Sequence, residues 1–189
     1  MDQLADAERR KYRAVWENDQ YRVVSPGARH LGSALGLLRP RAGSSFTDWG
    51  CGTGVVAEEL RRRGFEVRLV DIAHNAYKGD LPFTEACLWD LPAELPASDY
   101  GYCADVMEHI PTERVDAVFA GIAQRTLRAC YFQIALFHDT SFTANGPLHL
   151  TVQPDSWWLE QTAKHFTVGE VHRIRAKHLL VLATATTRQ

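Results

Sequence analysis

The stretch FTDWGCGTGVVAEELRRRGFEVRLVDIAHNA, residues 46–76, places three glycines between an apolar run and an amphipathic run. Its patterning predicts a strand, a helix that ends at Gly64 and a second strand, over residues 46–49, 55–63 and 66–72. Glycines in such a loop permit a tight turn and remove the Cβ atoms that would keep a ligand from the backbone. The loop therefore predicts a binding site for a small molecule.

Two ligands compete for this loop, a dinucleotide and an adenosine-bearing small cofactor. The dinucleotide fingerprint GxGxxG needs one more residue before its third glycine, and here Gly54 comes one position early, which disfavours a pyrophosphate. Asp71, at the end of the second strand, is placed to accept hydrogen bonds from the two hydroxyls of a ribose. A purely structural turn would explain the glycines but not the acid. The pair predicts a ribose-bearing cofactor without a pyrophosphate.

The rest of the chain alternates between strand and helix patterns. Two helices are expected before the glycine loop, over 6–21 and 26–38. After the first two strands we expect further strands at 86–89, 100–106, 130–137, 168–174 and 177–185, and helices over 112–127 and 154–165. This order predicts an α/β fold with a doubly wound, seven-stranded, mostly parallel sheet whose last strand is antiparallel. We expect one domain over 1–189, with a helical prefix or cap (1–43) and a Rossmann-like core (44–189).

Composition indicates an ordinary globular protein. The 189 residues are 46% hydrophobic and 23% charged, with a formal net charge of −2. The start of the chain is charged and no apolar run approaches the length of a membrane span, so we expect a cytoplasmic protein without a membrane segment. Four cysteines without a CxxC pair are expected to be reduced thiols. The oligomeric state is not predicted.

At its glycine loop the sequence resembles the class I S-adenosylmethionine-dependent methyltransferases. TDWGCGTG is similar to the first motif of that family and VDIAHNA to its acidic second motif. The resemblance implies S-adenosylmethionine as cofactor, with its methionine portion near Asp48 and the loop residues Gly50, Cys51, Gly52 and Gly54. It also implies ribose binding by Asp71 and adenine contacts by Ile72, Asp90 and Leu91. A weaker likeness to small methyltransferases of phages and glycan-modifying gene clusters names no acceptor.

The segment ADVMEHIP follows the fourth predicted strand and brings polar residues to the carboxyl edge of the sheet, where open α/β sheets bind ligands. Asp105 is expected beside the cofactor. Glu108, His109 and the later His149 are the candidate catalytic residues, with His109 or His149 as a general base. The alternative is that Glu108 and His109 only orient the loop and fix the methionine end of the cofactor.

The same residues raise the alternative of a metal site. Asp105, Glu108 and His109 form a DxxEH pattern, and His149 or His138 would complete a set of ligands for Mg²⁺, Mn²⁺ or Zn²⁺. The pattern resembles the ExxEH motif of the metal-dependent branch that includes ubiquinone-biosynthesis O-methyltransferases and small-RNA terminal 2′-O-methyltransferases. This chain departs from that motif, because its first acid is Asp and not Glu.

The predicted function is S-adenosylmethionine-dependent methyl transfer to oxygen or nitrogen of a small molecule, such as a sugar, nucleotide or metabolite precursor. Residues 71–116 hold ten acidic and two basic side chains, which favours a small acceptor over a nucleic acid. The basic prefix either contacts an anionic substrate or is a solvated helix face. The alternatives are metal-assisted methylation of a nucleic-acid or nucleotide sugar, and a non-catalytic sensor or partner subunit that binds S-adenosylmethionine.

Overall fold

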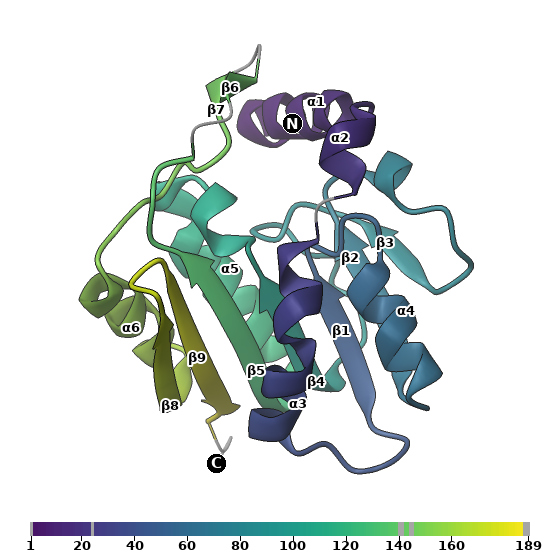
Figure 1. Ribbon diagram of the computed structural model, residues 1–189, viewed down its shortest axis with the longest axis vertical. Helices are drawn as coiled ribbons and strands as arrows, with labels where there is room; N and C mark the ends of the chain where they lie inside the picture. Colours follow the sequence, from purple (N-terminus) through teal and green to yellow (C-terminus); the bar gives the residue numbers. More distant parts are fainter. Residues whose placement is uncertain (1, 24, 140–141, 144–145, 187–189) are drawn as a thin grey trace.

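A seven-stranded sheet forms the centre of the computed structural model, which describes residues 2–23, 25–139, 142–143 and 146–186 (Figure 1). The strand order is β3-β2-β1-β4-β5-β9-β8. Strands β1 to β5 are parallel, and β9 runs antiparallel to both of its neighbours, β5 and β8. The predicted fold class is confirmed. The strands are β1 Ser45–Trp49, β2 Glu66–Asp71, β3 Phe83–Glu85, β4 Ser98–Ala104, β5 Thr126–Ala135, β8 Phe166–Ile174 and β9 His178–Ala185.

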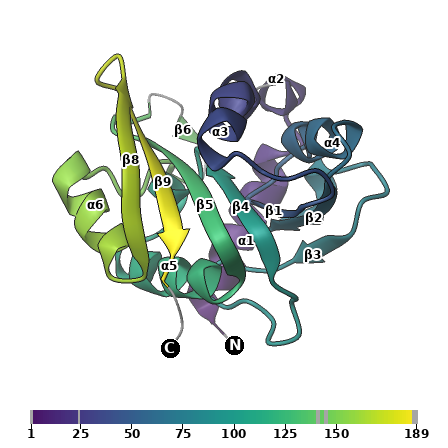
Figure 2. The same cartoon turned by 90° about the horizontal axis from the view of Figure 1, so that it is seen from below.

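Helices cover both faces of the sheet. Figure 2 shows α3 and α4 on one face and α5 and α6 on the other. The helix bounds are α1 Gln3–Val15, α2 Asp19–Arg22, α3 Leu31–Leu38, α4 Val55–Arg62, α5 Val115–Gln124 and α6 Asp155–Ala163. A separate pair of two-residue strands, β6 Phe142–Thr143 and β7 Gly146–Pro147, follows β5.

Strand β5 shows why the sheet is buried on both sides. Phe132 and Ile134 pack in the cluster under α5 and α6, whereas Ala129 and Tyr131 pack in the cluster under α3 and α4. Successive side chains of a strand point to opposite faces, so a continuous apolar run supplies two hydrophobic layers. Because α3 packs on the sheet through Leu31 and its neighbours, the second half of the predicted prefix is part of the core layer.

Two sequence-based element predictions were wrong. The strand predicted at 86–89 lies earlier, as β3, and residues 86–89 form a turn in which the Asp90 N–H donates to the Cys87 carbonyl at 3.0 Å. Ala86, Cys87 and Leu88 are apolar and buried, so the sequence of this turn resembles that of a buried strand. The helix predicted at 6–21 is two helices, because the Asn18 side chain accepts from the Gln20 N–H and starts α2.

Helices α1 and α2 lie across the carboxyl ends of the central strands, at the top of Figure 1. Arg22 holds this cap on the core, because its guanidinium donates to the carbonyls of Trp16, Asn75 and Ala76 at 2.8–3.2 Å. Arg13 adds an ion pair with Glu85 at 2.7 Å. Helices α1 and α2 are therefore docked on the core as a cap. Among the described residues, no helix is long and apolar enough to cross a membrane.

We expect Arg22→Ala to loosen this cap while leaving the sheet intact, since three carbonyls lose a charged donor. Amide hydrogen exchange over 3–22 should become at least about tenfold faster, with exchange in β5 unchanged. Arg10→Ala is the matched control, because Arg10 is an exposed arginine on the same cap. Unchanged exchange in Arg22→Ala would contradict the proposed role of this side chain in docking.

Candidate active site

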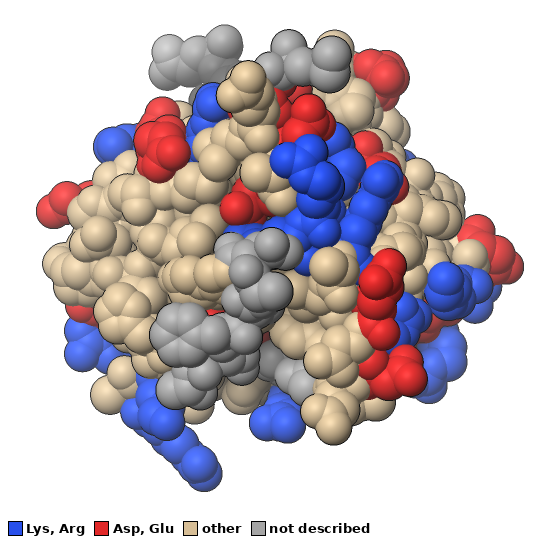
Figure 3. Space-filling model, turned by 90° about the horizontal axis from the view of Figure 1, so that it is seen from above, with Lys and Arg blue, Asp and Glu red and all other residues tan. Residues whose placement is uncertain are grey.

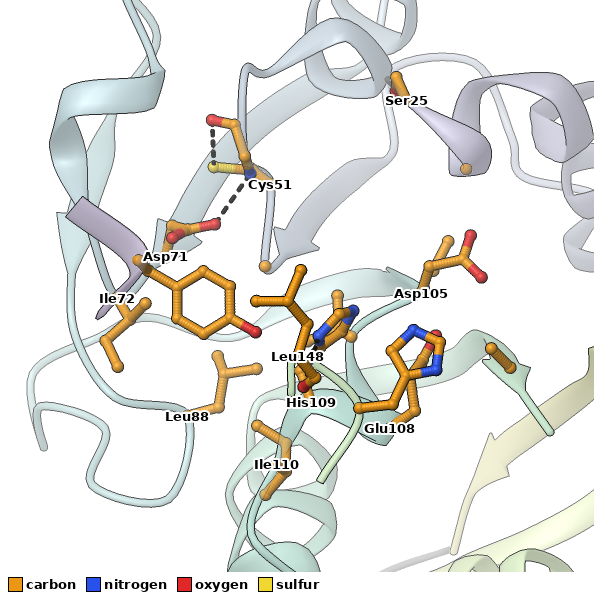
Figure 4. Close-up of a pocket in the computed structure, with 18 of the residues that line it drawn as sticks. Ser25, Cys51, Asp71, Ile72, Leu88, Asp105, Glu108, His109, Ile110 and Leu148 are labelled. Atoms are coloured by element: carbon orange, nitrogen blue, oxygen red, sulfur yellow. Dashed lines mark hydrogen bonds between the residues drawn. The ribbon is translucent and has the colours of Figure 1, made fainter. Parts of the chain in front are cut away.

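A cavity of about 310 Å³ opens at the carboxyl ends of β1, β2 and β4, beneath the cap. Figure 4 shows Asp71, Ile72 and Leu88 on one side of it, with Asp105, Glu108 and His109 on the other. The walls come from the glycine loop 50–54, the 3₁₀ turn Met107–His109, the segment around His149 and the cap. This is the edge at which the sequence predicted a ligand.

The glycine loop needs glycine for two reasons. Gly50, Gly52 and Gly54 all have positive φ, at 71°, 52° and 77°. A Cβ on Gly50 would lie 2.5 Å from Val106 Cγ2, and one on Gly52 would lie 2.9 Å from the Trp16 ring. Gly50, Gly52 and the intervening Cys51 line the cavity, whereas Gly54 caps α4. The loop backbone is therefore packed between the cap and β4 with little space to spare.

Asp71 ties the end of β2 to this loop. One carboxyl oxygen accepts from the Gly52 N–H at 2.8 Å and the other from the Ala73 N–H at 3.1 Å. Burial raises the pKa of Asp71 to about 6, although these N–H donors oppose the shift. The carboxylate thus fixes the loop and lines the cavity at the same time.

Asp48, on β1, is a second buried acid in the cavity wall. It is 4% exposed, and its Oδ2 is buried without a hydrogen-bond partner. Burial, followed by the nearby charge of Asp71, raises the pKa of Asp48 to about 7. Strongly raised carboxyl pKa values inside a cavity are typical of functional sites.

The segment after β3 reaches the cavity earlier than the sequence predicted. Leu88 and Trp89 line it, together with Ile72. Asp90 is exposed, and Leu91 packs toward Gly121 on α5. Because β3 ends at Glu85, residues 88–89, and not 90–91, pass beneath the opening. The structure thus brings Ile72 to the cavity wall and leaves Asp90 and Leu91 outside it.

Backbone hydrogen bonds bring His149 to the turn that carries Glu108 and His109. The N–H groups of Leu150 and Thr151 donate to the Glu108 carbonyl at 2.8 and 2.9 Å. The His109 and His149 rings meet edge to face, with centroids 4.8 Å apart. His149 therefore shares one corner of the cavity with Glu108 and His109, although it follows His109 by 40 residues.

The hydrogen bonds of the two imidazoles settle their tautomers. Nδ1 of His109 lies 3.0 Å from the Leu148 carbonyl, and Nδ1 of His149 lies 2.7 Å from the Phe137 carbonyl. A carbonyl only accepts, so Nδ1 carries the proton in each neutral ring and Nε2 carries the lone pair. Burial, followed by the charge of His149, lowers the pKa of His109 to about 3. His109 is therefore neutral at pH 7.

Glu108 is fully buried, and neither carboxyl oxygen has a well-formed hydrogen bond. Burial and the charge of Asp105 raise its pKa well above the usual range, against a smaller opposing effect of the Glu108 and Ala135 N–H groups. One ligand atom each from Glu108, His109 and His149 lie within 4.8 Å of one another. The group offers two imidazole nitrogens and a carboxyl.

Asp105 lies apart from that group of three. It has a φ of +54°, its Oδ2 accepts from Gln133 Nε2 at 2.5 Å, and its Oδ1 lies 3.5 Å from His178 Nε2. His138 is exposed and also lies outside the group. Sequence reasoning missed His178. The only sequence signal was its place at the start of the last strand, whose antiparallel pairing with Ala135 puts it at the ligand edge.

Aromatic side chains of the cap close the cavity from above. Tyr12, Trp16 and Tyr21 line it, and the Tyr12 ring contacts His109 with centroids 6.0 Å apart. The Tyr12 hydroxyl is buried without a hydrogen-bond partner. A buried hydroxyl in this state is a group to which a bound ligand can supply the missing partner.

No family model matches this sequence. Part of it is similar to ubiquinone biosynthesis O-methyltransferases. The match to the enzyme of Chromobacterium violaceum is 35% identical over 81 residues, which is 37% of this chain and 35% of the relative. That of Paracidovorax citrulli is 31% identical over 86 residues, covering 39% and 36%. The matches therefore span about a third of these relatives.

Solved structures resemble nearly the whole chain. The 1,6-didemethyltoxoflavin-N1-methyltransferase of Burkholderia thailandensis, bound to its substrate and S-adenosylhomocysteine, has a TM-score of 0.71 at 16% identity and covers 97% of this chain and 89% of its own. The N-methyltransferase NodS of Bradyrhizobium japonicum, with S-adenosylhomocysteine, has a TM-score of 0.70 at 12% identity, covering 94% and 98%. Strand order, glycine loop and these neighbours agree: the chain has the class I fold of the S-adenosylmethionine-dependent methyltransferases.

Proposed function

We propose that this protein transfers a methyl group from S-adenosylmethionine to oxygen or nitrogen of a small-molecule acceptor. One observation carries the proposal: a single cavity joins the acid-anchored glycine loop to the corner that holds Glu108, His109 and His149. A cofactor held at the loop would present its reactive end to two imidazoles. The likeness to methyltransferase structures with bound cofactor supports this reading.

The residues at the loop fit the cofactor. Asp48 Oδ2 has no partner, which suits the ammonium of the methionine portion, and the backbone of Gly50 and Gly52 lines the cavity. Asp71 keeps lone pairs beyond its two backbone bonds for ribose hydroxyls. When bound, the sulfonium of S-adenosylmethionine supplies an electrophilic methyl group.

The chain's own contribution is position and proton transfer. Methyl transfer needs the acceptor in line with the methyl group, and most of the gain comes from that placement. His149 Nε2 is placed to take the acceptor proton, because its Nδ1 is held on a backbone carbonyl. The pKa of His109, lowered to about 3, makes that imidazole a poor base, so we expect it to position the acceptor. The half-buried corner and the aromatic cap above it limit the access of water.

A second candidate is a metal-assisted O-methyltransferase, which includes methylation of a nucleotide or nucleic-acid sugar. The observation in its favour is that both imidazoles hold their Nδ1 proton on backbone carbonyls, as metal-binding histidines do. Glu108, His109 and His149 would hold the ion, with Asp105 outside the group. A metal would act as a Lewis acid toward an acceptor oxygen.

A third candidate, a non-catalytic protein that binds S-adenosylmethionine, explains the glycine loop but not the corner. A fully buried, unpartnered Glu108 is costly for a fold that does not use it. The production of S-adenosylhomocysteine from S-adenosylmethionine in the presence of a panel of small amines, phenols and sugars separates the enzyme from the sensor.

Calorimetric titration tests the cofactor. We expect S-adenosylmethionine and S-adenosylhomocysteine both to bind, and Asp71→Asn to weaken binding by roughly tenfold or more, because a buried carboxylate that anchors the loop is lost. Asp80→Asn, on an exposed acid, is the control. If neither ligand bound the wild-type protein, the glycine loop would have only a structural role and the proposed function would fail.

Asp48→Asn should stabilise the empty protein while weakening cofactor binding. The folded protein keeps the Asp48 proton to about pH 7, whereas the unfolded chain releases it near its ordinary pKa of 3.8. The free energy of unfolding therefore falls as the pH rises from about 4 to about 7, because folding keeps Asp48 protonated. Above pH 7 the loss is on the order of 1–4 kcal/mol. Thermal unfolding at pH 5 and pH 8 measures this, with Asp80→Asn as control. A gain that did not grow with pH would contradict the assignment.

His149→Ala decides between the first two candidates. If a metal is used, Zn²⁺ or Mn²⁺ should bind the chelator-stripped protein, and the variant should weaken that binding by about tenfold or more. His138→Ala, on an exposed histidine outside the group, should bind as the wild type does. If the heat of metal binding were the same in His149→Ala as in the wild type, the metal candidate would fail and His149 would remain a candidate base.

A further inference from the structure

The cavity lining is strongly acidic. Among the residues that the structure describes, it includes six carboxyl side chains and no lysine or arginine. Two of the acids, Asp48 and Asp71, belong to the cofactor end. Asp105, Glu108 and Asp139 lie toward the other end, with Glu8 on the cap. Glu8 is paired with Lys11, and the raised pKa of Glu108 keeps that carboxyl protonated. The negative charge of the acceptor end therefore comes from Asp105 and Asp139. With no lysine or arginine among the described lining residues, this end favours a cation over an anion.

The basic residues of the cap do not reverse this sign. Figure 3, which views the molecule from above the cap, shows Lys and Arg side chains gathered on its outer surface, with acids among them. Lys11 pairs with Glu8 at 2.5 Å, and Arg9 and Arg13 pair with Glu85. Arg22 is held by backbone carbonyls. Arg9, Arg13 and Arg22 dock the cap on the core, whereas the Lys11 pair lies within α1. None of these four cations lines the cavity.

The acceptor end is a built site. The Asp105 backbone has a positive φ, which is uncommon for a residue other than glycine. Gln133 holds Asp105 on both sides, because its carbonyl accepts from the Asp105 N–H at 2.9 Å and its Nε2 donates to the carboxylate. The carboxylate is thereby aimed at the cavity, opposite His178.

Two further observations point to a cationic ligand. Glu108, fully buried in the same wall, has no hydrogen-bond partner for either carboxyl oxygen. Phe137 presents a ring between His149 and His178, with centroids 5.3 and 5.5 Å away. The ring already has a cation at its surface, since Lys177 Nζ lies 5.8 Å from its centroid. A carboxylate beside an aromatic face is a common receptor for an ammonium group.

We propose that the end of the cavity formed by Asp105, Glu108, Phe137 and His178 binds a protonated amine, and that the acceptor is an amine on an apolar or aromatic frame. The inference rests on the proposed methyl transfer and narrows its acceptor class. Before transfer the bound ammonium gives one proton to the Asp105 carboxylate or to solvent. The nitrogen lone pair then forms the bond to the methyl carbon as the bond from that carbon to sulfur breaks, which leaves S-adenosylhomocysteine.

A phosphorylated or carboxylated acceptor would place like charges together in a site with little water, which is strongly unfavourable. On the same ground, the amine proposal disfavours nucleotides and nucleic acids at this end when no metal is bound.

Matched probes of opposite charge test the proposal on the full chain. The protein is loaded with S-adenosylhomocysteine at pH 8 in the presence of EDTA and titrated with benzylamine, benzyl alcohol and benzoate, with NMR detection of the histidine rings. We expect benzylamine to bind at least about tenfold more tightly than benzoate, and to shift the His178 signals. EDTA ensures that no bound metal supplies or blocks the charge.

Two variants locate the site. Asp105→Asn should weaken the binding of benzylamine at least about tenfold and leave the binding of benzyl alcohol unchanged. Asp116→Asn, on an exposed acid that pairs with His165 outside the cavity, is the matched control. If Asp105→Asn does not fold, Phe137→Leu replaces it, since this half-exposed ring can be changed without opening the core. It should weaken benzylamine through the lost aromatic face.

Each outcome decides. Equal binding of the two charged probes, tighter binding of benzoate, or no binding of any probe would overturn the amine assignment. Benzylamine binding that neither Asp105→Asn nor Phe137→Leu changes would place the amine elsewhere and also overturn it. The saturation of the same sample with S-adenosylhomocysteine is measured first, so a failure of the cofactor proposal is seen separately from a failure of the amine proposal.

Discussion

The bond between the Asp71 carboxylate and the Gly52 N–H is the constraint on which the site depends. It holds the glycine loop in a left-handed conformation against the end of β2, at 2.8 Å, inside a buried wall. From this one contact follow the position of the loop, the start of α4 at Gly54 and the space above the sheet. The same carboxylate is the group that a ribose would meet, so the fold and the proposed cofactor site share a single residue.

The electrostatics of the cavity connect stability to function. Asp48, Asp71 and Asp105 are all ionisable groups whose pKa values burial raises to about 6 or 7. In the empty protein they oppose folding when ionised, and a positively charged ligand relieves that cost. A protein of this kind gives up stability in its unliganded form in order to favour cations.

The sequence signals of the proposed cofactor end are local, and the structure brings most of the predicted residues to the cavity wall, although Asp90 and Leu91 lie outside it. Three glycines, a strand before them and an acid at the end of the next strand fix one another's positions within 30 residues of chain. Sequence reasoning failed where tertiary pairing decides. The buried turn 86–89 has the hydrophobicity of a strand but forms no ladder, and His178 reaches the site only through the register of β9 on β5. Asp105 was grouped with Glu108 by spacing, whereas Gln133 holds it apart.

Hydrogen bonds from the N–H groups of residues 150 and 151 to the Glu108 carbonyl join two parts of the chain that form different ends of the cavity. The part that would face the proposed cofactor lies before residue 110, and the corner opposite is completed by a segment that follows β5 and is joined to the turn mainly through backbone atoms. Backbone contacts tolerate a change of side chain. Under the proposed function, substitutions around His149 would therefore change which acceptor fits while the proposed cofactor end stays as it is, so specificity would change without a new scaffold.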